Sequence, residues 1–567
     1  MRILSLPVIA LSFFLISLPE SGLTQNIQAD QELLRQQERE RALRQQLETS
    51  PSVQLQQATP AGERLPVSES PCNQIQVIRL QGKDHHRFSW ALNAANTEDD
   101  AAIGRCLGAK GIAIVIARIQ NAILQRGYIT TRVLATAQDL NTGTLMLTLL
   151  PGRIRKIRLA DGSGPRANEW NAMPAQAGDL LNLRELEQGL ENFKRVPTAE
   201  ADIQIMPSNA ADALPGDSDV IIQWKQALPL RLNLSFDDAG SKFNGKYQAG
   251  VTLSLDHWWR LNDLFYFSFN QDAGGGLAGP RGTQGHTVHY SLPFRNWLIS
   301  ATTSANSFHQ SVAGLNQTIT YSGQSNNSEL RIARLLYRDG VRKTNASLRL
   351  WTRESTRFVE DAEVSDQHRR NSGWEFALAH RELFNSASVN TTLAYRRGTG
   401  ALHAMHAAEE AFGEGTSRMQ VITADAQLAL PFALGTHHLR YSAAWRAQWN
   451  RTPLLAEDRF AIGSRYTVRG FDGELLLTGD RGWLLRQELA IAIADSGAEA
   501  FSGLDAGEVG GPASAVMSGT RLAGAVIGLR GSSKHLYWEA FVGTPLTKPE
   551  TYRTSKITSG FNLNLSF

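Results

Sequence analysis

The C-terminal part of the chain, residues 227–567, alternates apolar and polar residues over many short segments, and this pattern constrains the fold most strongly. Examples are residues 230–237, 347–350, 438–449 and 561–567, in which every second position is apolar. After the N-terminus, no segment offers about 18 consecutive apolar residues, so the sequence predicts no membrane-spanning helix. Strands with one apolar and one polar face suit lipid outside and water inside, and such a sheet must close because lipid tolerates no unpaired edge. The sequence therefore predicts a transmembrane β-barrel.

The length of this region sets the expected size of the barrel. At about 20–22 residues for each strand with its loop, the region holds about 16 strands. Aromatic residues near the expected strand ends fit the girdles of the two membrane interfaces. These residues are Trp258, Trp259, Tyr290, Trp297 and Trp449. A soluble β-sandwich or propeller is the alternative, but no blade-like repeat is evident.

The N-terminus has the features of a secretory signal peptide, which we assign to residues 1–24. Arg2 precedes an apolar stretch at residues 6–18, whose length of about 13 residues is too short for a spanning helix. Small residues favour cleavage after Thr24. The alternative interpretation is a buried strand or helix.

Export from the cytoplasm makes a disulfide possible. Cys72 and Cys106 are the only two cysteines of the chain. A bridge between them closes a loop of about 35 residues and stabilises the fold by about 3–4 kcal/mol. The sequence therefore predicts this disulfide.

Residues 25–48 contain a run of strong helix formers from Asp30 onward, without glycine or proline. The predicted helix is polar nearly all round, so it is solvated, forms a weak coiled coil, or lies in a watery cavity. Residues 49–71 hold four prolines among glutamine and serine, which is typical of an extended linker.

Residues 72–226 read as two copies of one small α/β module, 72–152 and 153–226. In each copy, a strand, an amphipathic helix and two further strands follow one another. For the first copy we expect strands at Ile75–Leu80, Thr130–Ala135 and Thr144–Leu150, and a helix with Ile112, Val115, Ile116, Ile119 and Ile123 on one face that ends at Gly127. For the second we expect strands at Ile154–Leu159, Asp202–Met206 and Asp219–Trp224, and a helical stripe of Leu183, Leu186, Leu190 and Phe193.

Charge and motif content disfavour several classes of function. The net charge is +3, from 57 basic and 54 acidic residues, so we expect no nucleic-acid partner. No nucleophile elbow or phosphate-binding loop is present, and we expect neither catalysis nor a cofactor. One group has metal-like spacing, but no second group accompanies it, and we expect no metal site. That group is His403, His406, Glu409 and Glu410.

Several stretches of the chain carry a family resemblance. GYITTRVL at 127–134, with QDL at 138–140 and LPGRI at 150–154, resembles the first POTRA module of two-partner secretion transporters, and residues 179–206 resemble the second. VRGF, formed by Val468, Arg469, Gly470 and Phe471, resembles the signature of the long sixth barrel loop. GLDAG at 503–507 resembles a strand motif with Gly503, Asp505 and Gly507, and the terminal Phe567 resembles the aromatic that the outer-membrane insertion machinery reads. In combination, the chain resembles the TpsB class.

The resemblance implies a 16-stranded barrel in the outer membrane of a Gram-negative bacterium, a plug helix joined by the linker, and two periplasmic POTRA modules. It implies secretion of a large unfolded exoprotein with an N-terminal secretion domain, by a chain that we expect to be a monomer in outer-membrane lipid. Haemolysins, adhesins and contact-dependent inhibition toxins are all compatible cargoes. The alternatives are an outer-membrane assembly factor, which usually has more POTRA modules and no plug, and a passive porin.

Two sites follow from this resemblance. It pairs Arg469 with Asp505, and the neighbouring glycines clear space for a bidentate contact that fixes the loop. The exposed strand edge of the first module is a candidate for binding extended client chain by β-augmentation. The residues expected there are Thr130, Thr131, Arg132 and Val133.

Overall fold

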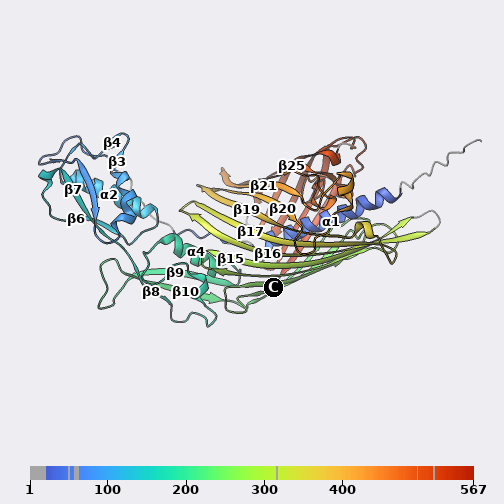
Figure 1. Ribbon diagram of the computed structural model, residues 1–567, viewed down its shortest axis with the longest axis horizontal. Coiled ribbons are helices and arrows are strands. Elements are labelled where there is room, and N and C mark those ends of the chain that lie inside the picture. Colours follow the sequence, from blue (N-terminus) through green and yellow to red (C-terminus); the bar gives the residue numbers. More distant parts are fainter. Residues whose placement is uncertain (1–20, 49–50, 56–62, 314–316, 495, 515–516) are drawn as a thin grey trace, which may run out of the picture.

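The computed structural model describes the chain apart from residues 1–20, 49–50, 56–62, 314–316, 495 and 515–516. Most of the predicted signal peptide and part of the predicted linker therefore lie outside the described residues. Two small modules and a barrel follow one another along the long axis of the molecule, and helix α1 (Ser21–Leu47) lies within the barrel (Figure 1). None of the described helices combines the length and apolar character needed to cross a bilayer.

Sixteen antiparallel strands close the barrel, as the alternation pattern predicts. The strands are β11 (Leu230–Asp237), β12 (Gln248–Asp256), β13 (Leu264–Asp272), β14 (Gly282–Phe294), β15 (Trp297–Ala313), β16 (Thr318–Arg338), β17 (Arg342–Val359), β19 (Arg369–Phe384), β20 (Ala387–Thr399), β21 (Gln420–Leu434), β22 (His437–Asn450), β25 (Arg481–Ile493), β26 (Ala498–Gly510), β27 (Arg521–Ser532), β28 (Leu536–Thr547) and β29 (Thr558–Ser566). The two-residue strand β18 (Ala362–Glu363) only extends the β17 hairpin.

The barrel closes where its first and last strands meet. Leu234 of β11 lies opposite Leu565 of β29, and the terminal Phe567 exchanges two backbone hydrogen bonds with Leu232, at 2.9 and 3.1 Å. Along the strands, large apolar side chains such as Leu330 and Leu350 are exposed on the outside. Their neighbours in sequence face inward, so one face meets lipid and the other lines a polar lumen.

Each module is a three-stranded sheet with helices. In the first, β7 (Thr144–Leu150) lies between β2 (Val77–Gln81), its parallel neighbour, and β6 (Arg132–Ala135), its antiparallel one. In the second, β10 (Ser218–Gln226) lies between β8 (Ile154–Leu159) and β9 (Ala199–Pro207). The helices are η1 (His85–Ala95) and α2 (Ala109–Gln125) in the first module, and α3 (Glu169–Ala172) and α4 (Leu183–Phe193) in the second; short strands β1 (Asn73–Gln74), β3 (Asn96–Thr97), β4 (Asp100–Ala101) and β5 (Cys106–Leu107) complete the first.

The predicted helical stripes are largely the module cores. All four predicted residues of α4 are buried, and in α2 Val115, Ile119 and Ile123 are buried. Ile114 is buried as well, whereas Ile112 and Ile116 are only partly covered. The structure also pairs Cys72 with Cys106. η1 and α3 were not predicted, because neither has an apolar stripe long enough to read.

Candidate functional site

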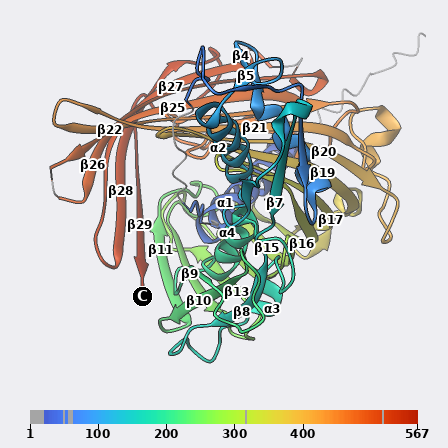
Figure 2. The same cartoon turned by 90° about the vertical axis from the view of Figure 1, so that its left-hand side faces the viewer.

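Helix α1 lies in the lumen of the barrel, surrounded by the strands (Figure 2). Its sequence allowed a solvated helix, a coiled coil or a watery cavity, and the structure selects the cavity. Polar side chains of α1 such as Glu32, Arg35 and Gln36 are buried there, each no more than 7% exposed. A helix that is polar all round fits this place because the inward faces of the strands are polar as well.

Salt bridges join α1 to strands on several sides of the lumen. Glu38 accepts two hydrogen bonds from Arg446 of β22, both of 2.8 Å. Further pairs bring α1 to strands elsewhere on the wall: Asp30 with Arg357, Arg41 with Asp425, and Arg44 with Glu329. Partly solvated pairs of this kind contribute little net stability each, but together they fix the position of the helix in the lumen.

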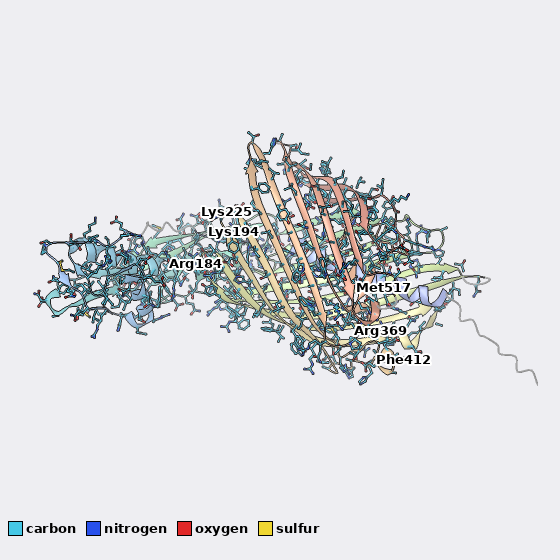
Figure 3. The ribbon with its side chains drawn as sticks, turned by 90° about the horizontal axis from the view of Figure 1, so that it is seen from above. Arg184, Lys194, Lys225, Arg369, Phe412 and Met517 are labelled. Carbon is cyan, nitrogen blue, oxygen red and sulfur yellow. A yellow bond between two sulfur atoms is a disulfide. The ribbon has the colours of Figure 1, made fainter. Side chains whose placement is uncertain are left out.

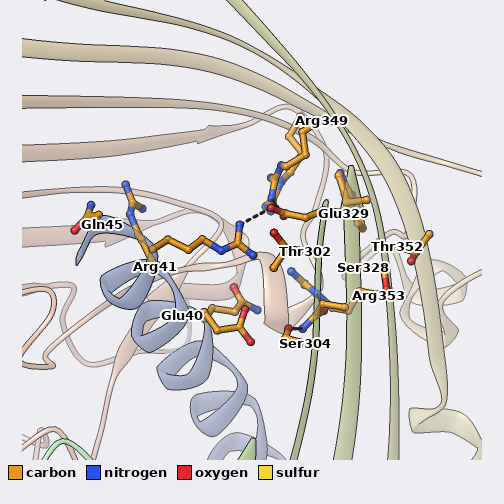
Figure 4. A pocket seen from close by; sticks show the side chains of 15 residues that line it. Glu40, Arg41, Gln45, Thr302, Ser304, Ser328, Glu329, Arg349, Thr352 and Arg353 are labelled. Carbon is orange, nitrogen blue, oxygen red and sulfur yellow. Dashed lines mark hydrogen bonds and ion pairs between the residues drawn. The ribbon is translucent and has the colours of Figure 1, made fainter. Parts of the chain in front are cut away.

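The lumen beside α1 is not completely filled. A cavity of about 310 Å³ lies between the helix and the wall, where Glu40 and Arg41 of α1 face Ser304, Glu329 and Arg349 of the strands (Figure 4). A polar cavity of this size holds several waters.

A second inward element is the loop between β22 and β25, which carries the short strands β23 (Phe460–Ile462) and β24 (Leu477–Gly479). Its Arg469 is 7% exposed and faces Asp505 of β26, which is 3% exposed. Arg469 donates from Nε at 2.7 Å, from Nη2 at 3.0 Å and from its backbone N–H at 3.0 Å to the two carboxylate oxygens of Asp505. Its Nη1 donates to Glu488 of β25 at 2.7 Å. The predicted pair is therefore brought together in a fixed orientation, with a second carboxylate that was not predicted.

Glycines allow the loop to approach the wall this closely. A Cβ on Gly503 would lie 2.6 Å from Nη2 of Arg469. Gly470 has φ of 95°, and a Cβ on it would lie 2.6 Å from the carbonyl oxygen of Thr544. On either side, Val468 is buried beside Gly507, and Phe471 packs edge-on against Tyr552 at 5.6 Å. All four residues of the VRGF segment thus pack closely against the inner wall of the barrel or against Tyr552.

We expect Gly503→Ala to displace the Arg469 side chain and to reduce export of the cargo, because overpacking a tight site costs about 1–3 kcal/mol. Gly510→Ala in the same strand is the matched control, since its Cβ has no atom nearer than 3.4 Å. Export and heat-modifiable migration of both variants check this. Equal export by the two variants would contradict the close-approach argument.

The loop and the helix also contact each other. Arg35 of α1 donates to the carbonyl oxygens of Gly473 at 2.6 Å and Glu474 at 3.1 Å, and Gln37 donates to that of Glu457 at 3.1 Å. The loop that Arg469 fixes therefore forms part of the surface on which α1 rests.

The four predicted client-binding residues do not all lie on the strand edge in the structure. Strand β6 begins at Arg132, two residues later than expected. Thr131 is fully buried, and its hydroxyl accepts from the backbone N–H of Gly152 at the junction of the two modules. At the outer edge of β6, the Gln120 side chain donates to Thr131 O and accepts from Val133 N, both at 2.9 Å. Client binding at this edge stays a prediction for the four residues Thr130, Thr131, Arg132 and Val133. The Gln120 side chain already occupies main-chain groups of the edge.

The loop group with metal-like spacing is divided among other partners. Glu410 accepts from Ser417 and Thr416 and pairs with His406 at 2.6 Å, whereas Glu409 pairs with Arg369. Within the described ranges, no group of three or more candidate ligands is arranged for a metal ion.

Sequence reasoning missed the salt bridges between α1 and the wall and the role of Glu488. The only available signal was the recurrence of arginines and acids at lumen-facing strand positions. Partners such as Glu38 and Arg446 lie 408 residues apart, and nothing local in the sequence pairs them.

Comparisons with known proteins agree with this architecture. The profile of the family "Haemolysin secretion/activation protein ShlB/FhaC/HecB" matches residues 216–531, and POTRA profiles match residues 74–152 and 153–207. Outer membrane transporter CdiB-2 of Burkholderia pseudomallei is 35% identical over 95% of this chain and 94% of its own length. Hemolysin transporter protein ShlB of Serratia marcescens is 24% identical over 84% of this chain and 82% of its own length.

Solved structures give the same result. CdiB from Acinetobacter baumannii superposes with a TM-score of 0.84 at 29% identity, over 97% of this chain and 100% of that chain. The overall fold is therefore shared with a solved relative along nearly the whole chain. The chain belongs to the ShlB/FhaC/HecB family of haemolysin secretion/activation proteins, which are outer-membrane transporters.

Proposed function

We propose that this chain is the transporter of a two-partner secretion pair. Its POTRA modules recognise an unfolded exoprotein in the periplasm, α1 leaves the lumen, and the exoprotein crosses the outer membrane through the barrel. One observation carries the proposal: the lumen is occupied by a polar helix that salt bridges join to the wall, in a chain 35% identical to an outer membrane transporter. A passive porin needs neither the helix nor the modules.

The names of the relatives favour one class of exoprotein as the cargo. A relative at 35% identity and a solved structure at 29% are both named CdiB, whereas the haemolysin transporter is more distant at 24%. We therefore favour a large exoprotein of the contact-dependent inhibition type over a haemolysin. The chain performs no catalytic step in this scheme, and folding of the exoprotein outside the cell makes its return unfavourable.

Membrane assembly uses the C-terminus. Phe567 is 61% exposed and directly follows β29, which closes the barrel, a position in which the outer-membrane insertion machinery can recognise it. The Arg469–Asp505 contact holds the inward loop during transport, and a single copy of the chain forms the complete pore.

Comparative proteomics of a deletion strain of the native host tests the proposal. We expect loss of one large exoprotein from the cell surface and medium, with other barrel proteins unchanged. Broad depletion of many barrel proteins would instead identify an assembly factor and overturn the proposal.

A further inference from the structure

The segment that follows the plug helix, Pro51–Leu55, is bound rather than free. Val53 and Leu55 are partly buried and pack against the core of the second module, whereas Ser52 and Gln54 are exposed. This alternation has the period of an extended chain. The sequence predicted an extended linker in this stretch and gave no sign of these contacts.

Side chains of helix α4 bind the main chain of this segment. The backbone N–H of Val53 donates to Oε1 of Glu191 at 3.0 Å, and that of Leu55 donates to Oε1 of Glu187 at 2.9 Å. The carbonyl oxygen of Val53 accepts from Arg338, which ends β16. The spacings match, because four helical residues rise about 6 Å and two extended residues span about 6.6 Å.

The two carboxylates are held in place by cations from the barrel and from α4. Arg338 contacts Glu187 at 3.1 Å and Glu191 at 3.0 Å, Lys343 of β17 also pairs with Glu191, and Arg184 donates to Glu187 at 2.6 Å. Burial raises the pKa of the Glu191 carboxyl, but Lys343 and Arg338 outweigh burial and hold that pKa below its usual range. Both acids are therefore fixed acceptors, each with one oxygen turned toward the bound segment.

The site lies at the end of the barrel that faces the modules. Arg184 and Lys194, at the two ends of α4, mark this end, while Phe412 and Met517 mark the opposite one (Figure 3). A cavity of about 240 Å³ adjoins the site and is lined by Glu48 at the end of the plug segment and by Glu191 and Lys343. The site therefore lies where the second module contacts the barrel.

We propose that Glu187, Glu191 and Arg338 form a binding site for an extended polypeptide with apolar side chains at alternate positions, occupied at rest by Pro51–Leu55. Because the contacts are made to main-chain groups, the site accepts other sequences. An arriving exoprotein segment binds there when the chain's own segment dissociates. Exchange at this site links arrival of the exoprotein to release of α1, which is joined to the same segment. This inference rests on the proposed function for the identity of the second occupant.

Peptide binding to the full chain in detergent micelles tests the site. The probe is a fluorescent synthetic peptide with the sequence of residues 49–58. The protein carries Val53→Asp and Leu55→Asp, which place two further carboxylates beside Glu191 and Glu187 and free the site. We expect saturable binding to this variant and about tenfold or weaker binding to the native chain, whose own segment competes at high effective concentration.

Matched changes identify the contacts. N-methylation of the two probe amides that correspond to Val53 and Leu55 removes the donors but keeps both side chains, and we expect about tenfold weaker binding. Adding Glu187→Gln and Glu191→Gln to the protein is expected to have a similar effect, whereas Glu185→Gln on the same helix is the control and leaves binding unchanged.

Three results bear on the inference separately from the proposed function. Equal binding of the methylated and parent peptides would overturn it, as would absence of binding to a variant that retains heat-modifiable migration. A peptide of different sequence that keeps the apolar alternation is expected to bind as well as the parent. Peptide binding without any exoprotein lost from the deletion strain would overturn the proposed function and leave the site standing.

Discussion

Deletion of residues 25–50 is expected to raise the conductance of the barrel severalfold in planar bilayers. Helix α1 has 27 residues and is about 10–12 Å wide with its side chains, so it fills much of the lumen that it occupies. A 16-stranded barrel without such a filling leaves an aqueous channel. The change is large because the entire helix is removed, whereas loss of one pair such as Glu38–Arg446 leaves the other contacts of the helix.

The control for this deletion keeps the lumen intact. Arg155→Ala breaks an exposed ion pair with Asp212 in the second module and is expected to leave conductance unchanged. Unchanged conductance in a deletion variant that is folded and inserted would show that α1 does not close the pore.

Arg469→Ala and Asp505→Ala are each expected to abolish most export while the barrel remains inserted. Removing one partner of a buried, fully hydrogen-bonded pair costs about 3–5 kcal/mol, because the other charge is left buried without it. The Arg469 side chain donates two hydrogen bonds to Asp505 and one to Glu488, and Arg469→Ala removes all three, leaving only the backbone N–H bond to Asp505. The inward loop, which is part of the surface on which α1 rests, is then no longer fixed by this side chain. The double variant is expected to be little worse than either single one, since both remove the same contact.

Arg521→Ala is the matched control for this pair. Arg521 pairs with Glu508 at 3.1 Å across the neighbouring strands β26 and β27, but its side chain is 73% exposed, and such pairs contribute about 0–1 kcal/mol. Export by immunoblot of culture medium, with heat-modifiable migration for insertion, measures the effect. Normal export by both the Arg469 and Asp505 variants would show that export does not depend on fixing the loop through this pair.

The elements that local pattern determines were predictable from the sequence. Strand β8 occupies Ile154–Leu159 as expected, and the barrel strands follow from alternation because each must present one face to lipid and one to water. Helix α1 was predictable as a helix, but its environment was not, since a polar surface suits bulk water and a polar lumen equally well.

The errors arise where main-chain contacts override local pattern. Thr130 and Thr131 extend the alternation of β6, yet they lie at the module junction, where Thr131 binds Gly152. The linker prediction for Pro51–Leu55 did not include the two carboxylates that bind its amides, because a main-chain contact leaves no trace in the side chains of the bound segment. The glycine motif around Asp505 was informative because only a close approach explains its missing side chains.

The most direct measurement of passage through the barrel is photo-cross-linking from a single lumen position in the native host. Ser304 is 3% exposed and lines the cavity beside α1, whereas its neighbour Thr303 points outward. With a photo-reactive residue in place of Ser304, we predict an adduct with one large exoprotein during secretion, and no such adduct from position 303. Absence of any exoprotein adduct at position 304 in secreting cells, or the same adduct from both positions, would contradict transport through the lumen.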